Sequence, residues 1–217
     1  IGELGPTAVG EIRDRLKAKL FPKAGSTCQC GCNEVACGGA EAINAPNLDD
    51  LPKRPPVLCP GCPHRGIFFA LNRLNVVVTG DIGCYTLGVF PPLSRIDTVL
   101  CMGGGVSMAH GMDKAGEPKK VVGMVGDSTF FHSGITGLLD IAYNKGSSTI
   151  FVLDNRTTAM TGHQDHPGTG RTLMGEATVE ASIEEIGRAC GMKNVVTIDP
   201  YDIKASTATI REAVESD

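Results

Sequence analysis

The segment that decides the fold is KKVVGMVGDSTFFHSGITGLLDIAYNKGSSTIFVLDN, residues 119–155, which has the pattern of a strand, a helix and a second strand. The two short apolar runs are Val121–Val125 and Thr149–Leu153. Between them, from Gly134 to Asn144, apolar residues recur at the spacing of one buried helix face, and Gly146 ends that helix. The segment therefore predicts two parallel strands joined by a crossover helix.

Polar residues follow both strands. Asp127 comes after the first strand and Asn155 after the second. A right-handed crossover places the carboxyl ends of both strands at one edge of the sheet, where ligands bind in open α/β folds. A carboxylate and an amide oxygen suit Mg²⁺ completed by diphosphate oxygens. We expect Gly126 to allow close approach of the backbone, and the N–H groups of Ser128 and Thr129 to face phosphate. The alternative is an ordinary strand-to-helix turn and a polar strand end.

The rest of the chain extends this pattern into a doubly wound α/β domain with a mostly parallel sheet of about five or six strands. Glycine-bearing strand ends at residues 80–84, 102–105 and 126–128 predict a cofactor cradle at one edge of the sheet. The long polar stretch 156–168 is expected at the same edge, where such loops are usually functional. The further predicted strands are Val76–Thr79, Thr98–Met102 and Asn194–Ile198, and the further helices are Ile67–Leu74, one following Gly105, Thr178–Cys190 and Tyr201–Glu215.

Residues 1–56 differ from this domain, which is predicted to span residues 57–217. They begin with a short amphipathic pattern typical of a connector helix and continue as a linker rich in Gly, Pro and Cys. The linker contains CQCGCNEVAC, whose spacing matches neither the common iron–sulfur nor the zinc-ribbon patterns. A metal site and an extended, reduced linker both remain open for its four cysteines, Cys28, Cys30, Cys32 and Cys37.

Composition limits the class of function. The chain has 217 residues, 41% of them hydrophobic, so it can bury a core. Its net charge of −4 argues against a nucleic-acid-binding protein, which would be expected to show a basic stripe. No apolar run approaches the roughly 18 residues that span a membrane, and the first residues lack a secretory pattern. Nine cysteines, an odd number, in an acidic enzyme-like chain favour thiol or metal chemistry over disulfides. We therefore expect a cytoplasmic protein.

Four motifs occur in a characteristic order: CPGCPHRG at 59–66, GDIGCYTL at 80–87, the GDS…DN pair, and MTGHQDHPGTG at 160–170. From Pro55 to the C-terminus the chain resembles the diphosphate-binding region of the alpha subunits of indolepyruvate ferredoxin oxidoreductases, within the 2-oxoacid:ferredoxin oxidoreductases. The resemblance implies a thiamine diphosphate-binding fold. Two positions depart from the common GDG…NN signature, namely Ser128 in place of Gly and Asp154 in place of Asn.

The resemblance also implies a cofactor site. Mg²⁺ would be held by Asp127, the side chain of Asn155 and the carbonyl oxygen of Thr157. The diphosphate would meet Gly126, Ser128 and Thr129. The remaining expected cofactor contacts are Cys62, Gly83, Cys84, Tyr85, Met102, Gly103, Met160 and Thr161.

Histidines are the candidate catalytic residues. His64 is expected in the cofactor pocket, His132 beside the diphosphate or the reacting centre, and His163 near the active edge, where a group that titrates near neutral pH could donate a proton or bind the substrate carboxylate. His166, like His163, could donate a proton or bind the substrate carboxylate. The alternative for His132, His163 and His166 is a solvent-exposed position.

The cysteines Cys59, Cys62 and Cys84 match the first three ligands of a [4Fe–4S] cluster in related oxidoreductases, and Cys190 is the candidate fourth. Such a cluster would accept electrons one at a time. The alternative is that Cys59 and Cys62 shape a turn and that Cys190 is an ordinary buried residue.

The implied reaction is oxidative decarboxylation of a 2-oxoacid such as indolepyruvate, with coenzyme A accepting the acyl group and ferredoxin accepting the electrons.

The resemblance also implies that the glutamate that activates thiamine diphosphate belongs to a pyrimidine-binding domain, which is not expected within these 217 residues. The chain is therefore expected to be a fragment or subunit that is inactive alone. Its expected partners are a pyrimidine-binding domain or subunit, a ferredoxin-like cluster domain and a second (beta) subunit. The alternatives are a non-oxidative thiamine decarboxylase or synthase and a cysteine-rich zinc module.

Overall fold

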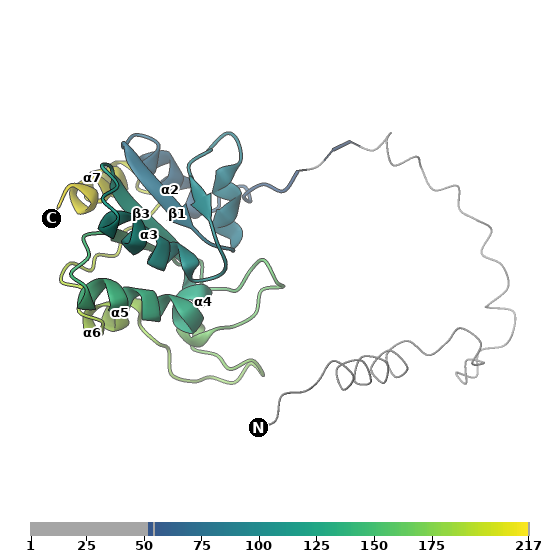
Figure 1. Cartoon of the computed structure of the whole chain (residues 1–217). Coiled ribbons are helices and arrows are strands. Elements are labelled where there is room, and N and C mark those ends of the chain that lie inside the picture. The colour runs from purple at the N-terminus through teal and green to yellow at the C-terminus, as the bar shows by residue number, and fades with distance from the viewer. Residues whose placement is uncertain (1–51, 54, 217) are drawn as a thin grey trace, which may run out of the picture. The chain divides into compact units, whose positions relative to one another are not determined.

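A four-stranded parallel sheet forms the centre of the computed structural model, which describes residues 52, 53 and 55–216 (Figure 1). The connector helix and linker predicted over residues 1–56, with their four cysteines, lie almost wholly outside the described residues. The spatial order is β2-β1-β3-β4, and all three strand pairs are parallel, as predicted. The strands are β1 (Val76–Gly80), β2 (Thr98–Val99), β3 (Lys120–Gly126) and β4 (Thr149–Leu153).

Helices cover both faces of the sheet, which confirms the doubly wound α/β class, although the described residues form four strands and not the predicted five or six (Figure 1). Val122 and Met124 of β3 pack into a core with α2 (His64–Leu71) and α7 (Ile203–Glu215). Because side chains alternate along a strand, Val125 points to the opposite face. There it packs in a second core with the helices α3 (Gly104–Lys114), α5 (Ile135–Tyr143) and α6 (Ile183–Ala189).

The helix of the central βαβ unit begins at the turn that follows β3, as expected from the position of Ser128 and Thr129. The chain turns directly from β3 into α4 (Asp127–Thr129), passes through a π-helical turn η4 (Phe130–Gly134) and continues as α5. Helical backbone therefore runs without a break from residue 127 to residue 143. π-Helical turns inside helices are frequent at functional sites.

Two predicted elements are longer than those in the structure, and one predicted strand does not form in the described residues. The strand Thr98–Met102 is shortened to β2, because the chain turns at residues 101–103 to enter α3. The helix predicted from Thr178 begins only at α6, where Ser182 Oγ accepts a hydrogen bond from Glu185 N–H. Asn194–Ile198 makes no strand in this structure, since Val196 is 68% exposed and this segment has no ladder partner among the described residues.

Glycines let α3 lie directly against the sheet. A Cβ on Gly105 would lie 2.9 Å from both the carbonyl carbon of Gly80 and the carbonyl oxygen of Met124. Gly103, which precedes the helix, has φ +84°, a left-handed conformation that glycine adopts at little cost. The run Gly103-Gly104-Gly105 thus brings the start of α3 close to the ends of β1 and β3. Two 3₁₀ helices, η3 (Cys84–Val89) and η5 (Pro167–Thr169), lie at the same edge of the sheet.

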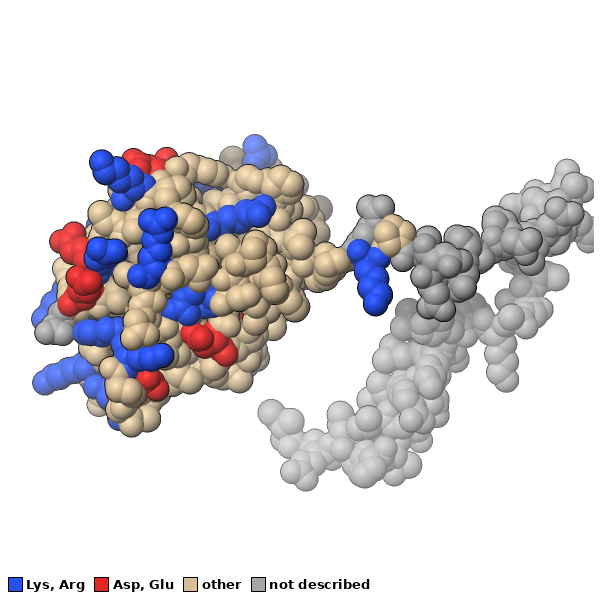
Figure 2. All heavy atoms as spheres, turned by 90° about the horizontal axis from the view of Figure 1, so that it is seen from above, with Lys and Arg blue, Asp and Glu red and all other residues tan. Residues whose placement is uncertain are grey.

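The surface carries charges of both signs. On the face shown in Figure 2, Lys and Arg side chains are interspersed with Asp and Glu, beside a broad area that carries neither. Within the described part of the chain, every helix is too short or too polar to cross a membrane.

Candidate functional site

A cleft lies at the carboxyl ends of β1, β3 and β4, where the sequence predicts the cofactor cradle. Its lining contains thirteen of the predicted site residues, together with Ile82, Leu153, Thr158 and Ala159, which were not predicted. The thirteen are His64, Gly83, Cys84, Tyr85, Met102, Gly126, Asp127, Ser128, Thr129, Asn155, Thr157, Met160 and Thr161. Residues from five separate segments of the chain therefore meet in one cleft.

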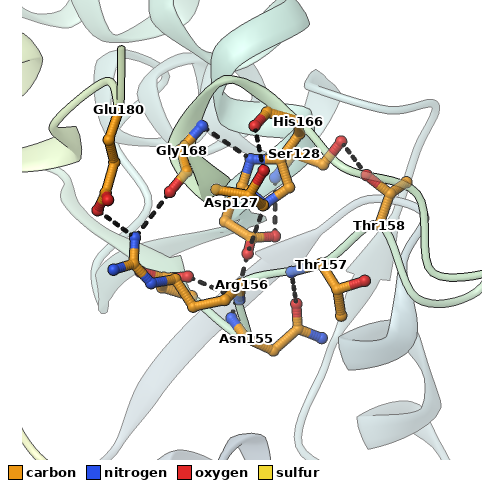
Figure 3. A network of polar contacts seen from close by, with 11 residues as sticks. Asp127, Ser128, Asn155, Arg156, Thr157, Thr158, His166, Gly168 and Glu180 are labelled. Atoms are coloured by element: carbon orange, nitrogen blue, oxygen red, sulfur yellow. Dashed lines mark hydrogen bonds and ion pairs between the residues drawn. The ribbon is translucent and has the colours of Figure 1, made fainter. Parts of the chain in front are cut away.

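Asp127 lies at the centre of a polar network at this edge (Figure 3). Its Oδ1 accepts a hydrogen bond of 2.7 Å from Ser128 N–H, and its Oδ2 accepts one of 3.2 Å from Asn155 N–H. The two residues are 28 positions apart, and the parallel pairing of β3 with β4 brings them together as predicted. The Ser128 N–H, which was expected to face phosphate, is instead satisfied by Asp127.

Three oxygen-bearing groups converge at this point, namely the Asp127 carboxylate, the Asn155 side-chain amide and the Thr157 carbonyl. The Asn155 amide nitrogen donates hydrogen bonds to Asp127 Oδ2 at 3.3 Å and to the Thr157 carbonyl oxygen at 2.7 Å. Carboxylate, amide and carbonyl oxygens are the ligands that Mg²⁺ prefers in proteins. A cation at this point would replace the N–H donor, and the amide would turn its oxygen inward.

Electrostatics at Asp127 favour a cation. Burial raises the pKa of the Asp127 carboxyl above its usual value, and the adjacent Asp154 carboxyl raises it further, although the Ser128 N–H and His166 act in the opposite direction. A buried carboxylate beside a second carboxylate carries negative charge that the protein only partly compensates. A divalent cation at the three oxygens would compensate it.

Ser128 and Thr158 connect the helix start to the opposite wall of the cleft. Thr158 Oγ1 donates a 2.8 Å hydrogen bond to Ser128 Oγ, which joins the end of the β3 turn to the segment after β4 (Figure 3). Ser128 occupies the position where related signatures have glycine. Its hydroxyl thus has a partner in the wall and does not close the cleft.

His64 and Tyr85 form the other side of the cleft. Their rings meet edge to face at 6.4 Å between centroids, and both residues are almost fully buried. Burial lowers the pKa of His64 to about 4, with a smaller opposing effect from Asp154. His64 is therefore neutral at pH 7.

Two other predicted catalytic histidines lie elsewhere. His132 is exposed on the π-helical turn, and His163 is exposed in the loop after β4, and neither lines the cleft. Gly103 also lies just outside the lining, directly after Met102. The geometry thus leaves His64 as the one predicted catalytic histidine that lines this cleft.

Of the four cysteines proposed for a cluster, Cys59, Cys62 and Cys84 lie close enough to interact electrostatically, and Cys190 lies apart. Cys62 and Cys84 are partly buried against the core that contains α2, and Cys59 is exposed at the start of the same turn. Burial is the main cause that raises the pKa of both Cys62 and Cys84. Cys190 is buried in the other core, on the opposite face of the sheet from Cys62 and Cys84. Within residues 55–216, no group of three or more His, Cys, Asp and Glu side chains is arranged to hold a metal.

The loop after β4 is fixed over the site by Arg156. Its Nη1 donates to the carbonyl oxygen of Gly168 at 2.7 Å and to Glu180 Oε1 at 2.5 Å (Figure 3). The neighbouring Glu180 carboxylate raises the pKa of Arg156 further above its already high value. The Arg156 guanidinium therefore connects the start of this loop with Gly168 and Glu180.

Two buried groups behind the cleft were not predicted from the sequence. His166, expected to be either a proton donor or substrate-binding group or a solvent-exposed loop residue, is buried against Asp127, with 3.1 Å between Nε2 and Oδ2. Asp81 lies fully buried under Gly103. The strand end GDIG indicated an edge position for Asp81, but its partner depends on how α3 packs against the sheet.

The comparison with known proteins identifies the class of this site. Residues 81–217 match the family described as thiamine pyrophosphate enzyme, C-terminal TPP binding domain. The chain belongs to this family. The matched region contains Asp127, Asn155 and Thr157, so the three convergent oxygens lie within a thiamine diphosphate-binding domain.

Curated relatives confirm the resemblance to indolepyruvate oxidoreductases. The chain is 46% identical to the indolepyruvate oxidoreductase subunit IorA of Pyrococcus horikoshii, over 76% of this chain and 28% of that protein. It is 44% identical to IorA of Methanothermobacter thermautotrophicus, over 78% of this chain and 29% of that protein. The chain thus spans under a third of the length of these relatives.

A solved structure shares the fold. The 2-oxoglutarate:ferredoxin oxidoreductase of Magnetococcus marinus, whose structure holds 2-oxoglutarate, coenzyme A and succinyl-CoA, superposes with a TM-score of 0.65. The match covers 76% of this chain and 61% of that chain at 22% sequence identity. The architecture of the domain is therefore that of a thiamine diphosphate-binding fold.

Proposed function

We propose that this chain is the diphosphate-binding part of a thiamine diphosphate-dependent 2-oxoacid:ferredoxin oxidoreductase that acts on indolepyruvate or a similar aryl pyruvate. The observation that carries the proposal is the convergence of the Asp127 carboxylate, the Asn155 amide and the Thr157 carbonyl in a cleft of this family. The names of the relatives support the substrate class. The complete reaction would release CO₂, transfer the acyl group to coenzyme A and pass electrons to ferredoxin.

The three oxygens would hold Mg²⁺, which would bind the diphosphate oxygens of the cofactor. The closeness of the three groups and the burial of the Asp127 carboxylate support this assignment. To bind the cation, the Asn155 amide would turn its oxygen toward Asp127 and Thr157. Thiamine diphosphate supplies the nucleophilic carbon and the electron sink that decarboxylation of a 2-oxoacid requires.

Other residues of this chain would position the cofactor. Met102 and Gly103 lie at the start of α3 and would support the pyrimidine ring, while the neutral His64 and Tyr85 form an adjacent wall. A neutral histidine adds no positive charge near the reacting centre and can accept or donate a hydrogen bond. We assign no catalytic step to His132 or His163, which are exposed.

Cysteines of this chain do not complete a cluster site in the described region. Cys59, Cys62 and Cys84 lie near one another and Cys190 lies in the other core, and among the described residues no group of three or more such side chains is arranged to hold a metal. We therefore place the electron carriers in the partners of this chain: a ferredoxin-like cluster domain, a second subunit and ferredoxin. A pyrimidine-binding domain would supply the glutamate that activates the cofactor.

The decisive experiment measures Mg²⁺-dependent binding of thiamine diphosphate by calorimetry, with this chain assembled with its pyrimidine-binding partner. We expect Asp127→Ala and Asn155→Ala to weaken binding by at least tenfold. The matched controls Glu212→Ala on α7 and Asn194→Ala remove exposed groups of the same type away from the cleft and should not change it. Equal binding by all four variants would refute the assignment of the site.

The runner-up function is a non-oxidative decarboxylase or synthase that uses the same cofactor. Ferredoxin reduction by the assembled enzyme, measured with indolepyruvate and coenzyme A under anaerobic conditions, separates the two. Release of CO₂ without reduced ferredoxin would favour the non-oxidative reaction.

A further inference from the structure

His166 is held in one orientation by contacts on all sides. Its Nδ1 accepts a 3.1 Å hydrogen bond from Gly168 N–H, and its ring lies 5.7 Å from the ring of Phe131 at an angle of 31°. Its carbonyl oxygen accepts hydrogen bonds from Thr169 N–H and Thr169 Oγ1. The side chain is only 3% exposed. The ring therefore has little freedom to rotate or shift.

These contacts fix where the ring carries its proton. Because Gly168 donates to Nδ1, that nitrogen must present its lone pair, and the hydrogen of the neutral ring must lie on Nε2. Nε2 lies 3.1 Å from Asp127 Oδ2, so the ring donates to the carboxylate. The bond joins two side chains that are 3% and 4% exposed, and it spans 39 positions of sequence.

We propose that His166 is a positioning residue for the metal-binding carboxylate, and that its neutral Nε2–H fixes the orientation of Asp127 for Mg²⁺. The inference rests on the proposed function, because it assumes that Asp127 binds the metal with the diphosphate. Carboxylates that bind metals are commonly oriented by such hydrogen bonds, and loss of the outer partner typically costs 10–100-fold in metal affinity.

A neutral donor suits this position better than a charged one. A Lys or Arg beside Asp127 would hold the carboxylate equally well, but its full positive charge would repel the cation at a distance of a few ångströms. The neutral imidazole contributes an N–H without a net charge, so the charge of Asp127 stays available for the metal. The backbone N–H groups of Ser128 and Asn155, which also donate to Asp127, share this property.

The loop architecture supports the same role. Pro167 follows His166 and begins η5, and its carbonyl oxygen accepts a hydrogen bond from Ala181 N–H. Arg156 holds the Gly168 carbonyl oxygen, as described above. These contacts fix the backbone on the C-terminal side of His166 at several points. His166 itself does not line the cleft, so it acts on the site through Asp127.

The test compares two variants of the assembled enzyme, in which His166 is replaced by an amide side chain of different length. In His166→Gln the side-chain nitrogen can take the place of Nε2, whereas in His166→Asn it can reach only the place of Nδ1. We expect His166→Asn to lower the Mg²⁺ affinity, titrated with thiamine diphosphate present, by 10–100-fold. We expect His166→Gln to stay within about threefold of the parent protein.

His110→Asn is the matched control, since His110 is also buried and lies 3.8 Å from a carboxylate, Asp140, away from the cleft. It should lower the unfolding temperature without changing the Mg²⁺ affinity. Equal affinities for His166→Asn and the parent would overturn the positioning role. So would equal losses in His166→Asn and His166→Gln, because the donor would then be irrelevant.

A measurement on the parent protein covers the case in which the variants do not fold. Nitrogen-15 NMR of the histidine rings at neutral pH, without metal, should show His166 as the Nε2–H tautomer. An Nδ1–H tautomer or a charged ring would overturn the proposal.

If the parent binds no thiamine diphosphate with Mg²⁺, the proposed function fails together with this inference. If the parent binds normally and only the His166 results disagree, this inference fails alone.

Discussion

Asp81 Oδ2 accepts a 2.6 Å hydrogen bond from Gly103 N–H, which ties the end of β1 to the start of α3. Asp81 is fully buried, and its other oxygen, Oδ1, has no partner within the described structure. Burial raises the pKa of this carboxyl to about 7, although hydrogen bonds from Gly103 and Gly105 lower it. Gly103, which together with Met102 is expected to support the pyrimidine ring, is therefore hydrogen-bonded to a carboxyl group whose pKa is about 7.

Asp81→Asn should make the chain more stable at pH 8. Between about pH 4, where an unfolded Asp loses its proton, and about pH 7, the folded state binds more protons than the unfolded state. The free energy of unfolding of the parent therefore falls as the pH rises through this window. The variant lacks this dependence and keeps an oxygen for Gly103. Because one pKa unit corresponds to about 1.4 kcal/mol, the gain at pH 8 is at most about 4 kcal/mol.

Urea unfolding from pH 4 to pH 8 measures this effect. Glu212→Gln, which neutralises an exposed carboxylate on α7, is the control and should follow the parent curve. A variant Asp81→Asn that is less stable than the parent at pH 8 would contradict the prediction. It would mean that the charged carboxylate is stabilised by a group that faces Oδ1.

The sequence predicted the cleft well because the cleft is built from strand ends. Parallel pairing alone brings Asp127 and Asn155 together, and the glycine turns at residues 80–84 and 102–105 follow from the same rule. His166 and Asp81 were harder to place, because their partners depend on tertiary packing and not on a repeated spacing. The same reason explains Cys190, since nothing in its local sequence shows which face of the sheet α6 covers.

His64 should make the chain sensitive to acid. An unfolded histidine gains a proton near pH 6.5, whereas the folded His64 stays neutral down to about pH 4 because it is buried. The unfolded state thus binds more protons in this window, and the free energy of unfolding falls as the pH drops from 6.5 to 4. The loss is at most about 3 kcal/mol. NMR titration of the His64 ring, together with urea unfolding over this range, tests the prediction.

His64→Phe preserves an aromatic edge against Tyr85 and removes the titrating group. We expect this variant to lose less stability than the parent between pH 6.5 and pH 4. A His64 ring that titrates near pH 6.5 in the folded chain would show that it is accessible to solvent, and the prediction would then be wrong.

Gly105→Ala should destabilise the chain and weaken the cofactor cradle. The added Cβ would lie 2.9 Å from the backbone atoms of Gly80 and Met124, so α3 would have to move away from the sheet. Overpacking of this kind typically costs about 1–3 kcal/mol. Gly111→Ala, in the same helix, adds a Cβ with no neighbour within 4 Å and should stabilise the chain by up to about 1 kcal/mol. Urea unfolding distinguishes the two, and equal effects would contradict the close packing at Gly105.

Arg156→Ala should loosen the loop over the site more than it changes global stability. The ion pair between Arg156 and Glu180 is exposed, since the two side chains are 59% and 51% accessible, and such pairs contribute about 0–1 kcal/mol. The hydrogen bond from Arg156 to the Gly168 carbonyl oxygen acts locally, on the backbone beside His166. We therefore expect faster hydrogen exchange at Thr169 N–H, whose bond to the His166 carbonyl oxygen depends on this turn.

Arg188→Ala is the control for Arg156→Ala, because it removes an exposed ion pair of similar accessibility, with Glu184 on α6, that has no contact with the loop. Hydrogen exchange followed by mass spectrometry should show faster exchange over residues 166–170 in Arg156→Ala and unchanged exchange there in Arg188→Ala. Glu180→Gln should give an intermediate result, since it keeps the Gly168 contact and removes only the ion pair. Unchanged exchange over residues 166–170 in Arg156→Ala would show that η5 and the Ala181 hydrogen bond hold the loop without the guanidinium.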